Sequence, residues 1–475
     1  MAGWTMSEPP VSWTVAQLSN VGTWGSGGTP SRSNAKNFLG DIPWAVIGDL
    51  NDKTLHSTQQ QISNIGLNTS SAKLVPAQAL LVAMYGSIGK LSITGIECAT
   101  NQAIAFCIPD EELIDLKYLF YALRHSRTKL VELGQGAGQQ NISQTILKRF
   151  EIPVAPLKEQ KRIAQKLHAL LAQVDTLKAR IDAIPALLKR FRHATLSAAA
   201  NGDLTKDWRE VIQGTQDRES ANQYLARILE ARSLRPRTKF KPPVAPDTDT
   251  RSTEVPNTWV VSSVSSFAEC LDSMRVPVKK ELRAREGGIY PYFGANGEVD
   301  RVNEFLFDDD LVLVTEDETF YGRVKPIAYK YSGKCWVNNH VHVLRAHDKV
   351  GQSFLCYILM HYDVTPWLTG TTGRAKLTQG ALMALPIGVP PPDEQAEIVR
   401  RIEKLFAFAD QLEARVSAAR VRIDALTQSL LGKAFRGELV PQDPDDEPAS
   451  VLLERIRAQR AAAPKPKRGR KATVN

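Results

Sequence analysis

The fold is decided by a stretch near the middle of the chain, ISQTILKRFEIPVAPLKEQKRIAQKLHALLAQVDTLKARI (Ile142–Ile181). It recurs near the end as LTQGALMALPIGVPPPDEQAEIVRRIEKLFAFADQLEARV (Leu377–Val416). The two copies align without a gap for about sixty residues, at a constant spacing. A long internal repeat indicates duplicated structural units, which bury their apolar faces against one another. The repeat therefore predicts a duplicated architecture.

Both copies carry apolar residues three or four positions apart, the spacing that places one apolar stripe along a helix. The stripes are Ile163, Leu167, Leu170, Val174, Leu177, Ile181, Ile184 and Leu188, and Ile398, Ile402, Leu405, Ala409, Leu412, Val416, Ile423, Leu426 and Leu430. The first helix is expected over residues 158–200, about 60 Å at 1.5 Å per residue. Pro185 should kink it or begin a new helix near Ile184. The expected partner of each helix is the other helix; the alternative is packing on its own domain only.

Fainter similarity extends the repeat beyond the helices. Trp13 opens the first copy as Trp259 opens the second, and TNQAIAF (Thr100–Phe106) parallels VNNHVHV (Val337–Val343). Residues 25–95 and 270–330 show almost no similarity. We therefore predict two variable domains, each followed by a similar helical segment. Both domains mix strand-like alternation with helical stretches, which indicates an α+β class.

These observations divide the chain into six segments. They are a first variable domain (1–150), a central helical region (151–234), a Pro-rich linker (235–256), a second variable domain (257–388), a C-terminal helical region (389–462) and a basic tail expected to be disordered (463–475).

The composition is that of a soluble globular protein, and the basic charge is concentrated at one end. The formal net charge is +9, but the segment from Arg455 onward has eight Lys and Arg and no acid. Any nucleic-acid surface on the nearly neutral body must be a local patch. Five widely spaced cysteines, no signal peptide and no long apolar stretch predict a cytoplasmic protein without a membrane span.

Catalytic motifs are missing from the sequence. YGSIGKLS (Tyr85–Ser92) lacks the spacing of a phosphate loop and predicts a β-turn. His340 and His342 could share a strand face, but no third metal ligand follows, which favours a hydrogen-bonded strand histidine. No adenine-methyltransferase tetrapeptide is present. We expect no covalent chemistry, no cofactor and no metal on this chain.

Several motifs, in this order on a duplicated frame, resemble the DNA-specificity subunit of type I restriction–modification systems. They are WGSGGTPS (Trp24–Ser31), GDIPW (Gly40–Trp44), GAGQQNIS (Gly136–Ser143), P-x-x-E-Q at the start of each long helix, ANGDLTKDWR (Ala200–Arg209) and YPYFGANG (Tyr290–Gly297). The resemblance covers nearly the whole chain.

The resemblance implies two target-recognition domains separated by two long antiparallel helices, a coiled coil with a pseudo-two-fold internal repeat. Each domain would read one half of a split site in double-stranded DNA. The helices would dock two methyltransferase subunits, to which restriction subunits could be added. S-adenosylmethionine, ATP and Mg²⁺ would be used by those partners. Two alternatives stay open: a stand-alone tandem DNA-binding regulator, and a coiled-coil scaffold that binds protein.

Candidate DNA contacts are polar or basic residues of the variable domains, because base edges are read by hydrogen-bonding side chains. In the first domain they are Arg32, Lys36, Asn101, Gln102, Gln139, Gln140 and Asn141. In the second they are Arg275, Lys279, Lys280, Tyr292, Asn296, Arg323, Arg374 and Lys376. For each of them a solvated or turn-stabilising role is the alternative. The tail, PKPKRGRKATVN (Pro464–Asn475), could be a solubilising end, attract phosphates or enter the minor groove.

Overall fold

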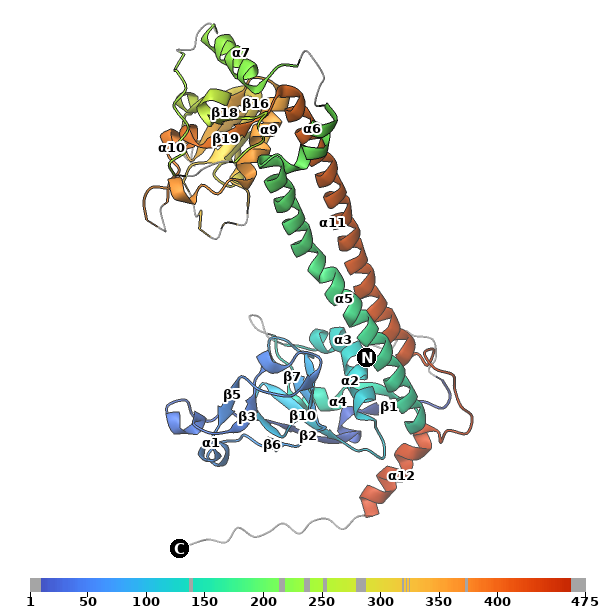
Figure 1. The fold of residues 1–475 in the computed structure, drawn as a ribbon. Helices are drawn as coiled ribbons and strands as arrows, with labels where there is room; N and C mark the ends of the chain where they lie inside the picture. Colours follow the sequence, from blue (N-terminus) through green and yellow to red (C-terminus); the bar gives the residue numbers. More distant parts are fainter. Residues whose placement is uncertain are drawn as a thin grey trace. The chain divides into compact units, whose positions relative to one another are not determined.

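The computed structural model describes residues 10–135, 140–212, 218–234, 240–250, 254–278, 288–317, 320–321, 323, 325–371 and 375–462. The chain forms two compact units (Figure 1). The first unit is Met1–Ile181 with Ala418–Asn475, and the second is Asp182–Ser417. Each unit combines one globular domain with the beginning of the long helix that follows it and the end of the other long helix.

The globular domain of the first unit is built from three small sheets. A two-stranded sheet pairs β1 (Thr14–Gln17) with β11 (Glu151–Val154). A five-stranded sheet has the order β2 (Gly22–Ser26), β10 (Ile104–Pro109), β7 (Leu80–Ala83), β8 (Leu91–Thr94) and β4 (Thr54–Leu55). A four-stranded sheet has the order β5 (Gln60–Ile62), β3 (Ile42–Ala45), β9 (Cys98–Thr100) and β6 (Leu74–Val75). The short helices are α1 (Asn64–Asn68), α2 (Leu116–His125), α3 (Arg127–Glu132) and α4 (Gln144–Arg149).

The second unit repeats this plan with a larger sheet. β12 (Val260–Ser263) pairs with β19 (Pro386–Val389), as β1 pairs with β11. The six-stranded sheet has the order β13 (Ala268–Cys270), β18 (Val341–Ala346), β16 (Phe307–Thr315), β17 (Ala328–Val337), β14 (Tyr290–Gly294) and β15 (Gly297–Val302). Its helices are α6 (Lys206–Ile212), α7 (Ala221–Ser233), α8 (Val264–Phe267), α9 (Lys349–His361) and α10 (Gln379–Ala384).

The two long helices are α5 (Leu157–Ala200) and α11 (Pro392–Phe435), and α12 (Ala449–Ala462) follows them. Ion pairs show that they run antiparallel within each unit. In the first unit Lys178 Nζ lies 2.7 Å from Asp424 Oδ1, and Arg162 near the start of α5 pairs at 2.6 Å with Asp446, which follows the end of α11. In the second unit an Arg192 guanidinium nitrogen lies 2.5 Å from Asp410 Oδ1, and Arg401 near the start of α11 pairs at 2.6 Å with Asp207, which follows the end of α5. The prediction that the two long helices pair with each other is therefore confirmed. The alternative, that each helix packs only on its own domain, is wrong.

The structure differs from the predicted helices in two details. No new helix begins near Ile184, because α5 runs through Pro185 without ending and a proline removes only one backbone hydrogen bond of a helix; the predicted kink stays a prediction. Leu177 does not lie in the buried stripe, since 48% of it is exposed, and Leu426 is exposed as well. Three-four spacing marks one face of a helix, but it does not tell how much of that face the partner helix covers at each position.

The long helices complete the core of each domain. In the first unit Leu167 of α5 and Leu431 of α11 join one apolar cluster with Tyr118 of α2. In the second unit Ile398 and Ile402 of α11 share a cluster with Phe354 of α9. The repeated helices are therefore part of each folded unit, which explains why their sequences are more alike than those of the sheets.

The predicted segment boundaries stay predictions, but two contacts bear on them. β11 lies just beyond residue 150, yet it pairs with β1 at the start of the first domain. The described part of the predicted linker has neither helix nor strand, and Val244 O accepts a hydrogen bond from Ser263 Oγ of the second domain at 2.7 Å. Among the described residues, no helix is long and apolar enough to span a membrane.

Candidate nucleic-acid interface

The residues that flank a glycine-containing segment are paired in the same way in the two domains. The first loop, residues 136–140, is closed by hydrogen bonds between Gln135 and Asn141, of 2.8 and 2.9 Å. The second, residues 370–375, is closed in the same way between Thr369 and Lys376, at 2.9 and 2.8 Å. Asn141 and Lys376 match in the repeat, and their similar pairing indicates that the two loop bases are structural equivalents.

A single residue in each domain joins the base of its loop to a neighbouring turn. Met84 N donates to Ala103 O at 2.8 Å, and Met84 O accepts from Ile142 N at 2.9 Å. Glu316 makes the corresponding bonds in the second domain, to His340 O at 3.0 Å and from Leu377 N at 2.8 Å. In each domain the end of a strand, a neighbouring turn and the base of the loop therefore lie together at one end of the main sheet.

In the first domain the structure brings together most of the predicted contacts. Gln140 and Asn141 are exposed at the base of the loop, and Met84 links them to the turn that holds Asn101 and Gln102. Gln102 in turn accepts a hydrogen bond from Thr29, in the segment that also carries the exposed Arg32 and Lys36. Gln139 lies outside the described residues.

The predicted DNA contacts of the second domain lie in different environments, and only some of them are exposed. Asn296 is exposed in the turn between β14 and β15, and Arg323 donates to the adjacent Ala295 O at 3.2 Å. Tyr292 is only 1% exposed, and its hydroxyl accepts from Val278 N at 3.4 Å, which favours a packing role. Arg275 and Lys376 belong to an ionic network beneath the second loop. Lys279, Lys280 and Arg374 lie outside the described residues. All these residues stay predictions as DNA contacts.

Five ionisable residues form this network. Glu316 accepts from Lys376 Nζ at 2.8 Å and from Arg275 at 2.5 Å. His342 Nδ1 lies 2.5 Å from Asp272 Oδ2, and its Nε2 lies 2.7 Å from Leu377 O. Asp272, Glu316 and His342 could hold a metal ion by their spacing. Both ring nitrogens and the Glu316 oxygens already have protein partners, however, so we interpret the cluster as an ionic network.

The acidic groups of the network have lowered pKa values. Burial raises the pKa of Asp272, but the hydrogen bond and charge interaction with His342, the hydrogen bond from Val343 N and the charge of Arg275 together outweigh it, so that the net pKa lies below the usual value. Burial likewise raises the pKa of Glu316, and the bonds from Lys376 and Arg275 bring it below the usual value. The bond to Glu316 raises the pKa of Lys376.

Acid should therefore destabilise the second domain. A carboxyl group with a lowered folded-state pKa stabilises the fold above its unfolded pKa, near 4–4.5, and this contribution is lost as the pH falls through the folded value. We expect the midpoint temperature of unfolding to fall when the pH is lowered below about 4.5. In the Glu316→Gln variant this fall should be smaller. Thermal unfolding between pH 3 and 7 checks this; an identical pH dependence in the two proteins would contradict it.

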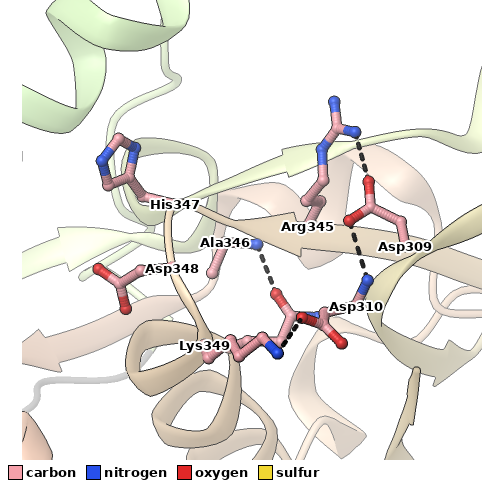
Figure 2. A pocket seen from close by; sticks show the side chains of 8 residues that line it. Asp309, Asp310, Arg345, Ala346, His347, Asp348 and Lys349 are labelled. Atoms are coloured by element: carbon pink, nitrogen blue, oxygen red, sulfur yellow. Dashed lines mark hydrogen bonds and ion pairs between the residues drawn. The ribbon is translucent and has the colours of Figure 1, made fainter. Parts of the chain in front are cut away.

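A polar pocket of about 400 Å³ lies elsewhere in the second domain. Figure 2 shows that four of its charged side chains form two pairs: Arg345 donates to Asp309 at 2.6 Å, and Lys349 Nζ lies 3.8 Å from Asp310. Within the part of the chain that the structure describes, none of the predicted DNA contacts lines this pocket. We assign it no role in recognition.

Comparison with known proteins decides the family. The model of the type I restriction modification DNA specificity domain matches residues 10–186 and 256–419, which is more than half of the chain. The chain belongs to this family. It is a DNA-specificity subunit of a type I restriction–modification system, and its function is to give the complex its DNA sequence specificity.

Two curated relatives match over nearly their whole length. The chain is 30% identical to the StySPI specificity subunit of Salmonella potsdam, over 97% of this chain and 98% of the relative. It is equally similar to the EcoKI specificity subunit of Escherichia coli K12, with the same coverage. Solved structures share the fold. The HsdS subunit from Thermoanaerobacter tengcongensis aligns with a TM-score of 0.52 at 17% identity, covering 91% of this chain and 99% of that one. A chain of a type I system studied for complex assembly and conformational transition gives a TM-score of 0.65 at 18% identity, covering 91% and 100%.

The structure also explains motifs of the specificity subunit whose role the sequence did not reveal. The Glu and Gln of P-x-x-E-Q are buried at the start of both long helices. Glu159 accepts from Trp13 Nε1 at 3.1 Å and from Gln442 Nε2 at 2.7 Å. In the second unit Glu394 accepts from Thr205 Oγ1 at 2.7 Å and from Arg209. Each glutamate thus ties the start of one long helix to the segment that follows the other.

Proposed function

We propose that each domain reads one half of a split double-stranded DNA site, chiefly through its glycine loop and the segments joined to it. The observation that carries this proposal is the equivalent closure of the two loops, at Gln135 and Asn141 and at Thr369 and Lys376. Their side chains differ, as two readers of different half-sites require. The stand-alone regulator and the scaffold are not favoured, because the family consists of specificity subunits.

The chemistry of the loops differs in a way that base recognition would use. Gln140 and Asn141 carry amides, which can bond the N6 and N7 of adenine, whereas Lys376 and Arg374 carry cations suited to guanine or phosphate. Gln102 and Lys36 lie on the segments joined to the first loop. We infer that the first domain relies more on amide contacts and the second on cationic ones.

The partners we propose are two methyltransferase subunits, with restriction subunits added to that complex. Each unit exposes apolar side chains on its portion of the long helices. They are Leu177, Val421 and Leu426 in the first unit, and Leu187, Phe191 and Phe408 in the second. One such set in each unit supports one methyltransferase per unit. Large exposed apolar patches mark protein-binding sites, and we propose that these side chains contribute to such a patch.

Co-expression with the cognate methyltransferase followed by native mass measurement tests this assembly. We expect a complex of one specificity subunit and two methyltransferases that methylates DNA. A stable one-to-one complex, or no complex, would contradict the proposal.

We further propose that this chain is non-catalytic and cytoplasmic. The sequence has no methyltransferase tetrapeptide, so S-adenosylmethionine, and with it ATP and Mg²⁺, would be bound by the partner subunits. The five cysteines all carry free thiols, and burial raises the pKa of Cys107 to about 12. Unpaired thiols are typical of the reducing compartment in which chromosomal DNA is methylated.

The basic tail lies outside the described residues and carries a separate prediction. Deleting residues 464–475 removes five basic residues, so non-specific binding should weaken while the recognised sequence stays the same. The slope of log affinity against log salt should fall by up to about 0.9 for each phosphate that the tail neutralises in the intact complex. Affinity measured against salt for the intact and truncated complexes checks this. An unchanged slope would leave the tail as a solubilising end, and a changed recognition sequence would favour groove insertion.

A further inference from the structure

The position beneath the glycine loop has opposite chemistry in the two domains. Met84 and Glu316 match because they make the same backbone bonds to the loop. Ala105 and His342 match through strand register, because β10 pairs with β7 as β18 pairs with β16. The first domain thus supports its loop with Met84 and Ala105, which are apolar, and the second supports its loop with a carboxylate and an imidazole.

Ser26 and Asp272 complete the comparison. Ser26 pairs with Ala105 across β2 and β10. Continuing the register of β13 and β18 places Asp272 opposite His342, to which it is hydrogen-bonded at 2.5 Å. The neutral residues Met84, Ala105 and Ser26 of the first domain therefore correspond to ionisable residues of the second domain, which are Glu316, His342 and Asp272.

Glu316 is the centre of the charged arrangement. Its side chain is 7% exposed, whereas that of its partner Lys376 is 47% exposed. Its other partner, Arg275, also donates to Val341 O at 2.7 Å, which anchors it to β18. A buried carboxylate held by two cations has little freedom to move, and it is costly to leave that carboxylate unpaired. Glu316 therefore restrains the side chain of Lys376 as well as the backbone at Leu377.

We propose that Glu316 is a positioning residue for DNA recognition by the second domain, holding Lys376 at the base of the second glycine loop. Arg275 and the pair of Asp272 and His342 keep Glu316 in place. The first domain uses apolar packing at Met84 instead and has no such dependence. This inference rests on the proposed function of the loop.

The test uses the intact complex with its methyltransferase subunits, on duplexes altered in one base pair of the first or the second half-site. Glu316→Gln should lower affinity for the intact site about tenfold and reduce discrimination in the second half only. The matched control is Glu269→Gln, which removes the negative charge of a residue that pairs with Arg345 at 2.9 Å in the same domain. This control should leave discrimination in both halves unchanged.

A double-mutant cycle separates positioning from a merely structural role. If Glu316 acts through Lys376, the effect of Glu316→Gln should largely disappear in a Lys376→Ala background. Additive effects, or equal losses in both half-sites together with a lower unfolding midpoint, would overturn the inference. Tighter binding by Glu316→Gln would overturn it too, because Glu316 would then compete with DNA for Lys376.

The two proposals fail in different ways. If Lys376→Ala leaves DNA binding unchanged, the proposed role of the second loop is wrong, and the inference falls with it. If Lys376→Ala weakens binding while Glu316→Gln does not, the loop keeps its role and only the positioning inference is overturned.

Discussion

Replacing the first domain with that of another family member is expected to change one half of the recognised DNA site and leave the other half as it was. The exchange should run from residue 10 to residue 154, because β11 (Glu151–Val154) pairs with β1 (Thr14–Gln17) of the same domain. Each mismatched base pair costs about 1–3 kcal/mol. Affinity for the original site should therefore fall by a factor of about 10³ or more.

Methylated sequences from cells that carry the chimera, together with binding to both half-sites, check this expectation. A chimera joined at residue 150 serves as a control, because it would pair β1 of one protein with β11 of the other and should be less stable. A change in both halves, or a folded chimera that binds no DNA, would contradict modular reading.

A charge in the buried stripe of α5 should have the second large effect. Leu167 is 0% exposed and belongs to the core of the first unit. Leu167→Glu would place a carboxylate there without a partner, at a cost of about 3–5 kcal/mol. We expect the first unit to unfold at much lower denaturant concentration and the complex to fail to assemble.

Leu177→Glu provides the matched comparison on the same helix. Because 48% of Leu177 is exposed, its replacement should change the free energy of unfolding by less than about 1 kcal/mol. It should nevertheless weaken methyltransferase binding if the exposed apolar residues form the docking surface. Denaturant unfolding and co-purification give both readouts. Equal destabilisation by the two variants would contradict the assignment of the buried stripe.

The sequence was sufficient to predict the duplicated architecture and the two long helices. The ungapped repeat and the three-four spacing predicted α5 (Leu157–Ala200) within one residue of its observed start. The same features predicted that the two long helices pair with each other. This succeeded because helix periodicity is local and the duplication supplies two independent copies of it.

The sequence was insufficient wherever the outcome depended on contacts between distant residues. It marked Leu177 as buried, because spacing identifies a face of a helix and not how much of that face the partner covers. Arg275 and Lys376 were chosen for their charge. Their common partner Glu316 lies 41 residues from Arg275 and 60 residues from Lys376 along the chain. No local pattern indicates such a pairing. Tyr292 belongs to a motif whose burial only the assembled sheet reveals.

A specificity subunit of this kind should choose the DNA sequence that its complex methylates. Methylome sequencing of a host with and without the gene, in the presence of the methyltransferase, tests this choice most directly. We predict that one bipartite motif, with two specific halves and an unspecified spacer, is methylated only when the gene is present. A methylome that is identical in the two strains, or a methylated motif that is continuous, would contradict the assignment.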